Sequence, residues 1–170
     1  VVGTVMSNLG LEKALERMDI RFLRTDVGDR HVYREMKDRD ALLGGEQSGH
    51  TILRAFRRSG DGILTALYFL KSLLHLGLTI PDVPRELQLY PQLMRSIRIS
   101  EKRPLEEWAE LSQLRESFKS RHGENSRVLI RYSGTEPKIR VMMESAEQRI
   151  IDENFHTFEE LIKTTIGQGV

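Results

Sequence analysis

The stretch from Arg131 to Arg140 combines the side chains that hold a phosphate group, in the order Arg-Tyr-Ser-Gly-Thr-Glu-Pro-Lys-Ile-Arg. An arginine guanidinium offers a planar set of N–H donors that matches two phosphate oxygens and stays charged at any working pH. Ser133 and Thr135 add hydroxyl donors, and Gly134 allows the backbone to take a positive φ and approach an anion. We therefore predict a phosphate-binding loop between two strands. The alternative is an ordinary solvated turn with surface arginines.

A second candidate site is the glycine-rich stretch 44–50, Gly-Gly-Glu-Gln-Ser-Gly-His. In an extended segment Glu46 and Ser48 point to the same side, so that a carboxylate and a hydroxyl can bind neighbouring sugar hydroxyls. His50 could donate to a hydroxyl or to a phosphate oxygen. The alternative is a turn whose Glu and Ser cap a neighbouring element.

Arg30 follows the end of a predicted strand at 20–25, where ligands gather in α/β sheets. An ion pair with Asp26 or Asp29 on the surface is an equally good interpretation. No metal site is predicted, because the five histidines lack ligand spacing and the loop before Asp61 offers a single carboxylate, better suited to capping a helix.

Composition limits the class of protein. The chain has 170 residues and a net charge of +1, and no clustered basic face indicates nucleic-acid binding. The absence of cysteine excludes disulfides and thiolate chemistry and suits a reducing, cytoplasmic setting. The longest apolar run, 63–76, is too short to span a bilayer and contains Lys71, so we predict no membrane partner.

The first half alternates strand and helix patterns, which predicts a three-layer α/β domain with a mixed sheet. Asp61 and Gly77 are expected to cap a helix over 62–76. This helix is apolar nearly all round, so we expect it to be buried. The other predicted elements are strands at 2–6, 20–25, 41–43 (running into Gly44 and Gly45) and 51–56, a helix beginning after Ser7 or Asn8, and a short helix at 32–37.

Three of the five prolines fall between residues 78 and 92. We therefore place a first domain at 1–80, a linker at 81–92 and a second domain at 93–170. The second domain is predicted to be a small α+β domain, an antiparallel sheet with helices on one face. Its predicted elements are strands at 93–99, 127–130 and 139–143, a helix with Pro104 in its first turn, and a helix over 147–166.

Three stretches, 5–11, 44–50 and 131–144, together resemble the α-D-phosphohexomutases. The resemblance covers essentially the whole chain in order and spacing. The wording Glu-Gln-Ser-Gly-His at 46–50 resembles the members that act on glucosamine phosphates more than those that act on glucose or mannose phosphates.

The resemblance implies an enzyme of four domains around one cleft, of which this chain would supply the third and fourth. By position, Glu46 and Ser48 would contact sugar hydroxyls, and the loops of Arg30 and His50 would line the same cleft. The residues that would hold the substrate phosphate are Arg131, Ser133, Gly134, Thr135 and Arg140.

The implied reaction interconverts glucosamine 6-phosphate and glucosamine 1-phosphate through a phosphoserine and a bisphosphate intermediate, in amino sugar metabolism that leads to cell wall precursors. The family's phosphoserine and its aspartate-rich Mg²⁺ loop belong to its first two domains, and neither motif occurs in this sequence. We therefore expect a fragment of a bacterial enzyme that is inactive alone and whose partners are a phosphosugar and the N-terminal domains. The alternatives are a mutase for glucose or mannose phosphates and a non-catalytic phosphosugar-binding module.

Overall fold

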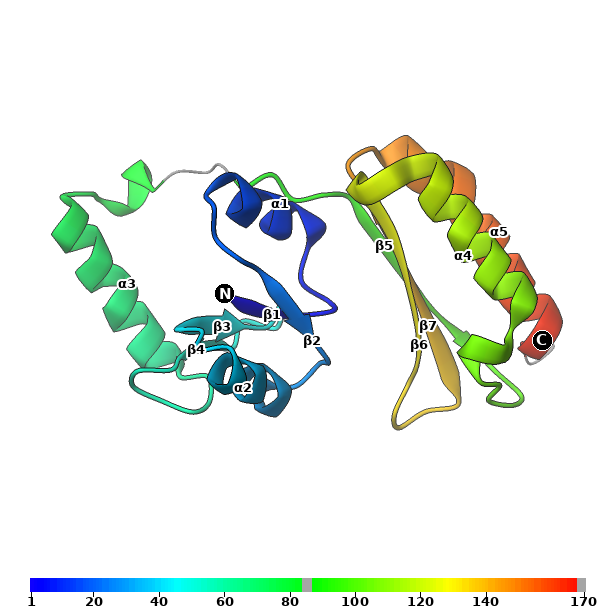
Figure 1. Ribbon diagram of the computed structural model, residues 1–170, viewed down its shortest axis with the longest axis horizontal. Helices are drawn as coiled ribbons and strands as arrows, with labels where there is room; N and C mark the ends of the chain where they lie inside the picture. Colours follow the sequence, from blue (N-terminus) through cyan, green and yellow to red (C-terminus); the bar gives the residue numbers. More distant parts are fainter. Residues whose placement is uncertain (84–86, 168–170) are drawn as a thin grey trace. The chain divides into compact units, whose positions relative to one another are not determined.

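A computed structural model describes residues 1–83 and 87–167 and divides the chain into two compact units, Val1–Leu89 and Tyr90–Val170 (Figure 1). The division falls inside the predicted linker 81–92. Residues 84–86 of that linker, and the last three residues of the predicted second domain, lie outside the described residues.

The first unit is built on a mixed four-stranded sheet in the order β2-β1-β3-β4. Strand β1 runs parallel to both β2 and β3, and β4 returns antiparallel to β3. Helices α1 and α2 lie on opposite sides of this sheet (Figure 1), which confirms the predicted α/β class. The elements are β1 (Val2–Thr4), α1 (Leu9–Arg17), β2 (Leu23–Thr25), α2 (Asp29–Asp38), β3 (Leu43–Gly45), β4 (Thr51–Leu53), α3 (Gly62–Leu76) and the 3₁₀ turn η1 (Ile80–Asp82).

Helix α2 packs directly on the sheet. Val32 and Met36 on its inner face are fully buried against Val2 and Ile52. The close approach requires a glycine at position 44, because a Cβ atom there would lie 2.5 Å from the Sδ of Met36. The first glycine of the 44–50 stretch is therefore fixed by packing, and it sets where the following loop begins.

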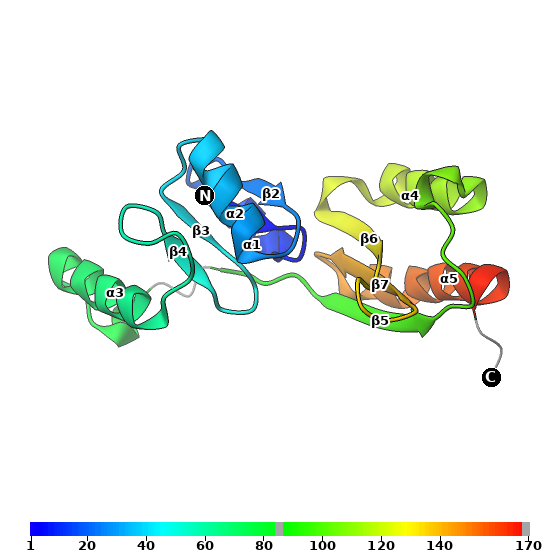
Figure 2. The same cartoon turned by 90° about the horizontal axis from the view of Figure 1, so that it is seen from below.

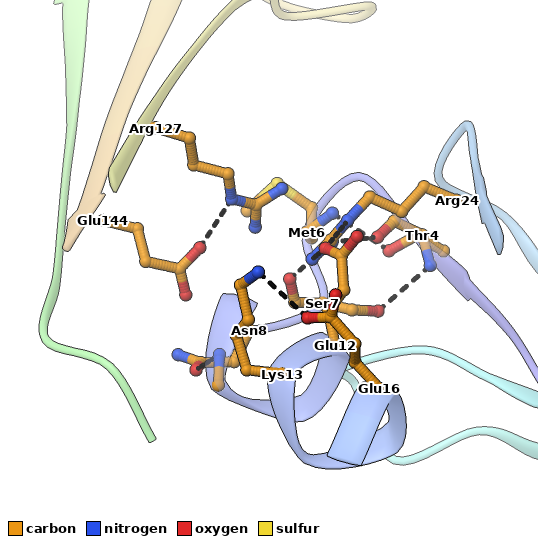
Figure 3. Close-up of polar contacts among 11 residues, drawn as sticks. Thr4, Met6, Ser7, Asn8, Glu12, Lys13, Glu16, Arg24, Arg127 and Glu144 are labelled. Atoms are coloured by element: carbon orange, nitrogen blue, oxygen red, sulfur yellow. Dashed lines mark hydrogen bonds and ion pairs between the residues drawn. The ribbon is translucent and has the colours of Figure 1, made fainter. Parts of the chain in front are cut away.

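The loop between β1 and α1 is held by Arg24 (Figure 3). Its Nη1 donates to the carbonyl oxygens of Thr4 and Ser7 at 3.1 and 2.6 Å, while Nε and Nη2 donate to one Glu12 carboxylate oxygen at 3.0 and 2.8 Å. Asn8 then caps α1, accepting from the backbone N–H of Gly10 at 2.8 Å. One guanidinium thus orders the loop that leads into α1.

Helix α3 has the predicted caps but not the predicted burial. Asp61 accepts from the N–H of Leu64 at 2.9 Å, and Gly77 ends the helix with φ 66°. Among its described residues Leu73 alone is buried, while Ile63 is 77% and Leu74 81% exposed. The prediction of a buried helix is wrong for this chain, because α3 stands beside β4, away from α1 and α2 (Figures 1 and 2), and its apolar surface exceeds what the unit can cover.

The second unit is a three-stranded antiparallel sheet in the order β5-β7-β6. Helices α4 and α5 lie on one face of this sheet (Figures 1 and 2), which confirms the predicted α+β arrangement. The elements are β5 (Gln92–Arg98), the 3₁₀ turn η2 (Leu105–Glu107), α4 (Ala109–His122), the 3₁₀ turn η3 (Gly123–Asn125), β6 (Ser126–Tyr132), β7 (Lys138–Ser145) and α5 (Gln148–Ile166).

The core of this unit lies between the sheet and the two helices. The predicted alternation in β7 is confirmed, since Ile139, Val141 and Met143 are all fully buried in it. The helices contribute aromatic residues, among them Phe118 and Phe158, whose rings meet edge to face at 5.9 Å.

The predicted helix starting at Pro104 is divided in two. After Pro104 the chain forms the turn η2, and the backbone of Trp108 is extended (φ −92°, ψ 90°) before α4 begins. The break turns the indole of Trp108 fully into the core, and the guanidinium of Arg103 lies 5.6 Å from its centroid.

The core predicts a clear stability difference between the two faces of the sheet. Replacing the buried Ile139 by Ala should lower the free energy of unfolding of this unit by about 2–5 kcal/mol, because it leaves a cavity under α5. Met94→Ala, at an exposed position on the opposite face, should change it by less than about 0.5 kcal/mol. Trp108, the chain's single tryptophan, reports the unfolding by fluorescence in denaturant. Equal losses in both variants would contradict this placement of the core.

Candidate functional site

The predicted phosphate loop is shorter than the sequence suggests, because the two strands extend into it. Strand β6 ends at Tyr132 and β7 starts at Lys138, so the connection is residues 133–137. Arg131 and Arg140 therefore lie within strands, directly opposite each other in the antiparallel register. Opposed residues of an antiparallel pair project from the same face. Both guanidinium groups thus leave the sheet on the face opposite the helices.

Two arginines opposite one another repel, and neither forms a direct ion pair with a carboxylate of the described residues. Neither Arg131 nor Arg140 has an ion-pair or hydrogen-bond partner within 1–83 and 87–167, and the Nε of Arg140 is buried without an acceptor. Like charges directly opposed across strands are destabilising, and a buried donor without an acceptor costs free energy. An anion bound between the two guanidinium groups would relieve both penalties.

The same sheet face shows a different arrangement four residues earlier. Arg127 lies opposite Glu144 in the register, and its Nε donates to the Glu144 carboxylate at 2.6 Å (Figure 3). Glu144 is fully buried. This chain therefore pairs a cross-strand arginine with a carboxylate at one end of the face and with a second arginine at the other.

Two further cations, which the sequence did not single out, belong to the loop end of this face. Arg98 on β5 lies opposite Lys138 on β7, and Ser96 lies opposite Arg140. We call Arg98, Arg131, Lys138 and Arg140 the cation cluster. The sequence could not reveal that Arg98 belongs to it, because the order of the strands is needed to place β5 beside β7.

The turn between the strands is closed by Ser133. Its N–H donates to the carbonyl oxygen of Lys138 at 2.8 Å, and its hydroxyl oxygen accepts from the N–H of Glu136 at 3.3 Å. Ser133 is buried, whereas Gly134 and Thr135 are exposed. The hydroxyl hydrogen of Ser133 remains able to donate to a ligand.

The expected positive φ at Gly134 is wrong. The glycines with positive φ among the described residues are 28, 49, 77 and 123, and a Cβ at position 134 would meet no atom within 4 Å. Neither conformation nor packing within the chain therefore requires glycine there. The turn has open space at this point, which a ligand can approach.

Glu136 is the carboxylate at the cation cluster. Its Oε1 lies 2.6 Å from the Nζ of Lys138. This hydrogen bond and the charge of Lys138, with smaller contributions from Arg140 and Arg98, hold the pKa of the Glu136 carboxyl below its ordinary value. The positive charge of the cluster therefore stabilises the ionised form of a side chain in the turn.

The second candidate site brings together three of the four predicted residues in the first unit. The Nδ1 of His50 lies 3.4 Å from a Glu46 carboxylate oxygen and 3.4 Å from the Ser48 hydroxyl. The other carboxylate oxygen of Glu46 accepts from the backbone N–H of Gly28 at 2.7 Å. Glu46 and Ser48 thus both lie beside His50, but residues 46–49 form a turn in which the Gly49 N–H donates to the Glu46 carbonyl oxygen at 3.0 Å, and not the extended segment that was expected. The hydrogen bond between Glu46 and the Gly28 N–H also connects the 44–50 loop to the loop that precedes α2.

Arg30 lies in the first turn of α2 and is exposed. It forms no ion pair with Asp26, Asp29 or Glu46 in the part of the chain that is described. Its guanidinium is therefore available, but the structure does not join it to the Glu46 group. Its role stays a prediction.

A pocket of about 390 Å³ opens beside Glu46 in the first unit. Glu46, Gln47 and His50 are among its polar lining residues, and Leu11 and Phe22 are among the residues of its apolar wall. A sugar ring presents hydroxyl edges and C–H faces, so both kinds of lining can contribute to binding one. The pocket and the cation cluster belong to different units.

Within the described residues, no three His, Cys, Asp or Glu side chains are grouped so that they could hold a metal ion. No described helix is long and apolar enough to cross a membrane.

The chain belongs to the phosphoglucomutase/phosphomannomutase family. Residues 1–90 match the family's alpha/beta/alpha domain III, and residues 94–161 match its C-terminal domain. The two units therefore follow one another along this chain in the same order as domain III and the C-terminal domain of the family.

Among curated proteins the chain is similar to phosphoglucosamine mutases. It is 40% identical over 168 residues to the enzyme of Koribacter versatilis and 37% identical over 167 residues to that of Bacillus subtilis. Each alignment covers 98% of this chain but 36% and 37% of the relative, so the chain spans little more than a third of their length.

Solved structures support the fold. The crystal structure of an N-acetylglucosamine-phosphate mutase in its substrate complex superimposes with a TM-score of 0.75 at 20% identity, covering 95% of this chain and 38% of that one. The Aspergillus fumigatus N-acetylphosphoglucosamine mutase in complex with GlcNAc-6P and magnesium gives 0.74 at 17% identity, covering 96% and 39%.

Proposed function

We propose that this chain forms the sugar-binding and phosphate-binding part of a phosphoglucosamine mutase, which interconverts glucosamine 6-phosphate and glucosamine 1-phosphate. The observation that carries the proposal is the cross-strand pair of Arg131 and Arg140, two guanidinium groups on one face for which the described residues give no direct ion pair. The similarity to phosphoglucosamine mutases supports the proposed substrate class.

In this proposal the cation cluster holds the phosphate that does not react. Arg131 and Arg140 donate to its oxygens, and Ser133 and Thr135 add hydroxyl donors beside them. The contact is by charge and hydrogen bonds to a phosphate group, so it does not depend on which sugar oxygen carries that group. Glu46, Ser48 and His50 bind the sugar hydroxyls.

The chemical step is proposed for residues outside this chain. There a phosphoserine O–P bond breaks while a sugar hydroxyl oxygen forms its own bond to that phosphorus, and the hydroxyl proton passes to the serine oxygen that leaves, which yields a sugar bisphosphate and a free serine. The serine then recovers a phosphoryl group from the other position. Mg²⁺, also proposed for the missing part, would neutralise charge on the transferred group. The contribution of this chain is positioning and charge neutralisation.

The phosphate role predicts a large loss when Arg131 is replaced by Ala. The substitution removes charge-assisted hydrogen bonds, so binding of inorganic phosphate and of glucosamine 6-phosphate should weaken by about 1.5–3 kcal/mol, roughly ten- to one-hundred-fold in Kd. Titration calorimetry measures it. Arg149→Ala, on an exposed arginine of α5, is the matched control and should change nothing. Unchanged affinity in the Arg131 variant would remove the basis of the proposal.

The sugar role predicts that Glu46→Gln separates two ligands. The amide oxygen can still accept from Gly28, so the loop should keep its shape, but the charge that binds sugar hydroxyls is lost. Binding of glucosamine 6-phosphate should weaken by about 1–3 kcal/mol while binding of inorganic phosphate stays as it was. Equal losses for both ligands in the same titration would mean that Glu46 has a structural role.

The assignment of the chemistry predicts no turnover by the purified chain. ³¹P NMR of glucosamine 6-phosphate incubated with it should show no glucosamine 1-phosphate, because the phosphoserine motif that the resemblance implies does not occur in this sequence. Conversion at a rate above the protein-free sample would refute this. Tighter binding of glucose or mannose phosphates in competition would instead favour a mutase of that substrate class.

A further inference from the structure

The turn that carries Glu136 is folded so that this carboxylate reaches back to the sheet. Lys138 holds it twice, since the backbone N–H of Lys138 donates to the Glu136 carbonyl oxygen at 2.8 Å and its Nζ to the carboxylate at 2.6 Å. The N–H of Glu136 in turn donates to the Ser133 hydroxyl oxygen. Glu136 is therefore tied to a cation and to a hydroxyl of the predicted phosphate site.

The charges around Glu136 are unbalanced. The cation cluster brings four positive side chains to one end of one face. Among the ion pairs of the described residues, the one that involves this cluster joins Lys138 to Glu136. Arg140 and Arg98 are close enough to stabilise its charged form. Its side chain remains 46% exposed, so it can turn away into water without unfolding the strand.

We propose that the Glu136 carboxylate is a resident counter-anion of the cation cluster, which competes with a ligand phosphate and limits how tightly the site holds it. The proposal rests on the proposed phosphate-binding function. A phosphate or sulfate that binds must replace Glu136 as the partner of Lys138. It must also neutralise the charge of Arg140, which otherwise stabilises the Glu136 carboxylate. When the anion leaves, the carboxylate returns and partly restores charge balance, so release is easier than from an uncompensated cluster.

The competition is tested by titrating the whole chain with sodium sulfate, whose charge is constant over the pH range used. Glu136→Gln should bind sulfate about two- to five-fold more tightly than the wild type, the range of effect of an exposed ion pair. Glu136→Asp keeps the charge and should stay near the wild type. Glu153→Gln removes an exposed carboxylate of α5 and should leave sulfate affinity unchanged.

A second readout separates competition from a structural role of the turn. Binding is reciprocal, so sulfate that displaces Glu136 must raise the pKa of its carboxyl toward the ordinary value. ¹³C NMR of the Glu136 carboxyl, titrated with and without sulfate, measures this. By the same linkage, sulfate affinity of the wild type should rise as pH falls through that pKa, and Glu136→Gln should lack this rise.

The outcomes distinguish the two proposals. If the wild type binds sulfate, Arg131→Ala weakens that binding at least ten-fold, and Glu136→Gln binds no more tightly, the counter-anion role is overturned while the phosphate site stands. An unchanged Glu136 pKa in saturating sulfate has the same meaning. If neither the wild type nor Glu136→Gln binds sulfate or phosphate, both proposals fall together.

Discussion

The register between β6 and β7 is the constraint on which the candidate phosphate site depends. Side chains alternate between the faces of a strand, so a slip by one residue would turn Arg131 or Arg140 toward the helices and expose the core residues. Burial of Ile139, Val141 and Met143 fixes the register. Each of these side chains contributes about 1.5–3 kcal/mol, whereas one opposed pair of like charges costs about 0.2–1 kcal/mol. The hydrophobic core therefore holds the two arginines together against their repulsion.

One sheet face thus has a neutral end and a cationic end. At the neutral end Glu144 is buried, and a buried carboxylate must be paired, which Arg127 achieves from the opposite strand. At the cationic end the turn is short and partly exposed, and solvent or a ligand can reach the guanidinium groups. In the first unit, too, the residues that stabilise the fold are distinct from those proposed to bind the ligand. Arg24 satisfies its donors inside the chain and orders a loop, while the proposed sugar-binding group stays at the edge of a pocket.

Local signals in the sequence predicted the local structure well. The caps at Asn8, Asp61 and Gly77 and the alternation of β7 each follow from neighbouring residues. The features that sequence reasoning missed depend on the tertiary structure. The place of Arg98 beside Lys138 depends on strand order, and the anchoring of Glu46 by the Gly28 N–H depends on two loops meeting. The apolar pattern of α3 indicated a helix that other residues should bury, but it did not show whether this chain contains those residues. The loops were identified as candidate sites from the sequence, and the roles of their residues remain proposals.

The position of the proposed counter-anion follows from what such a group must do. A carboxylate on a strand opposite Arg140 would be as fixed as Glu144 and would neutralise the arginine permanently, which would close the site to phosphate. A carboxylate on the exposed turn instead has a bond to one lysine and a path into water. It can lower the electrostatic cost of the empty site and still yield to a doubly charged ligand, because the Coulomb energy of the cluster with a dianion exceeds that with one carboxylate. A short turn between two strands that present arginines is therefore suited both to binding an anion and to releasing it.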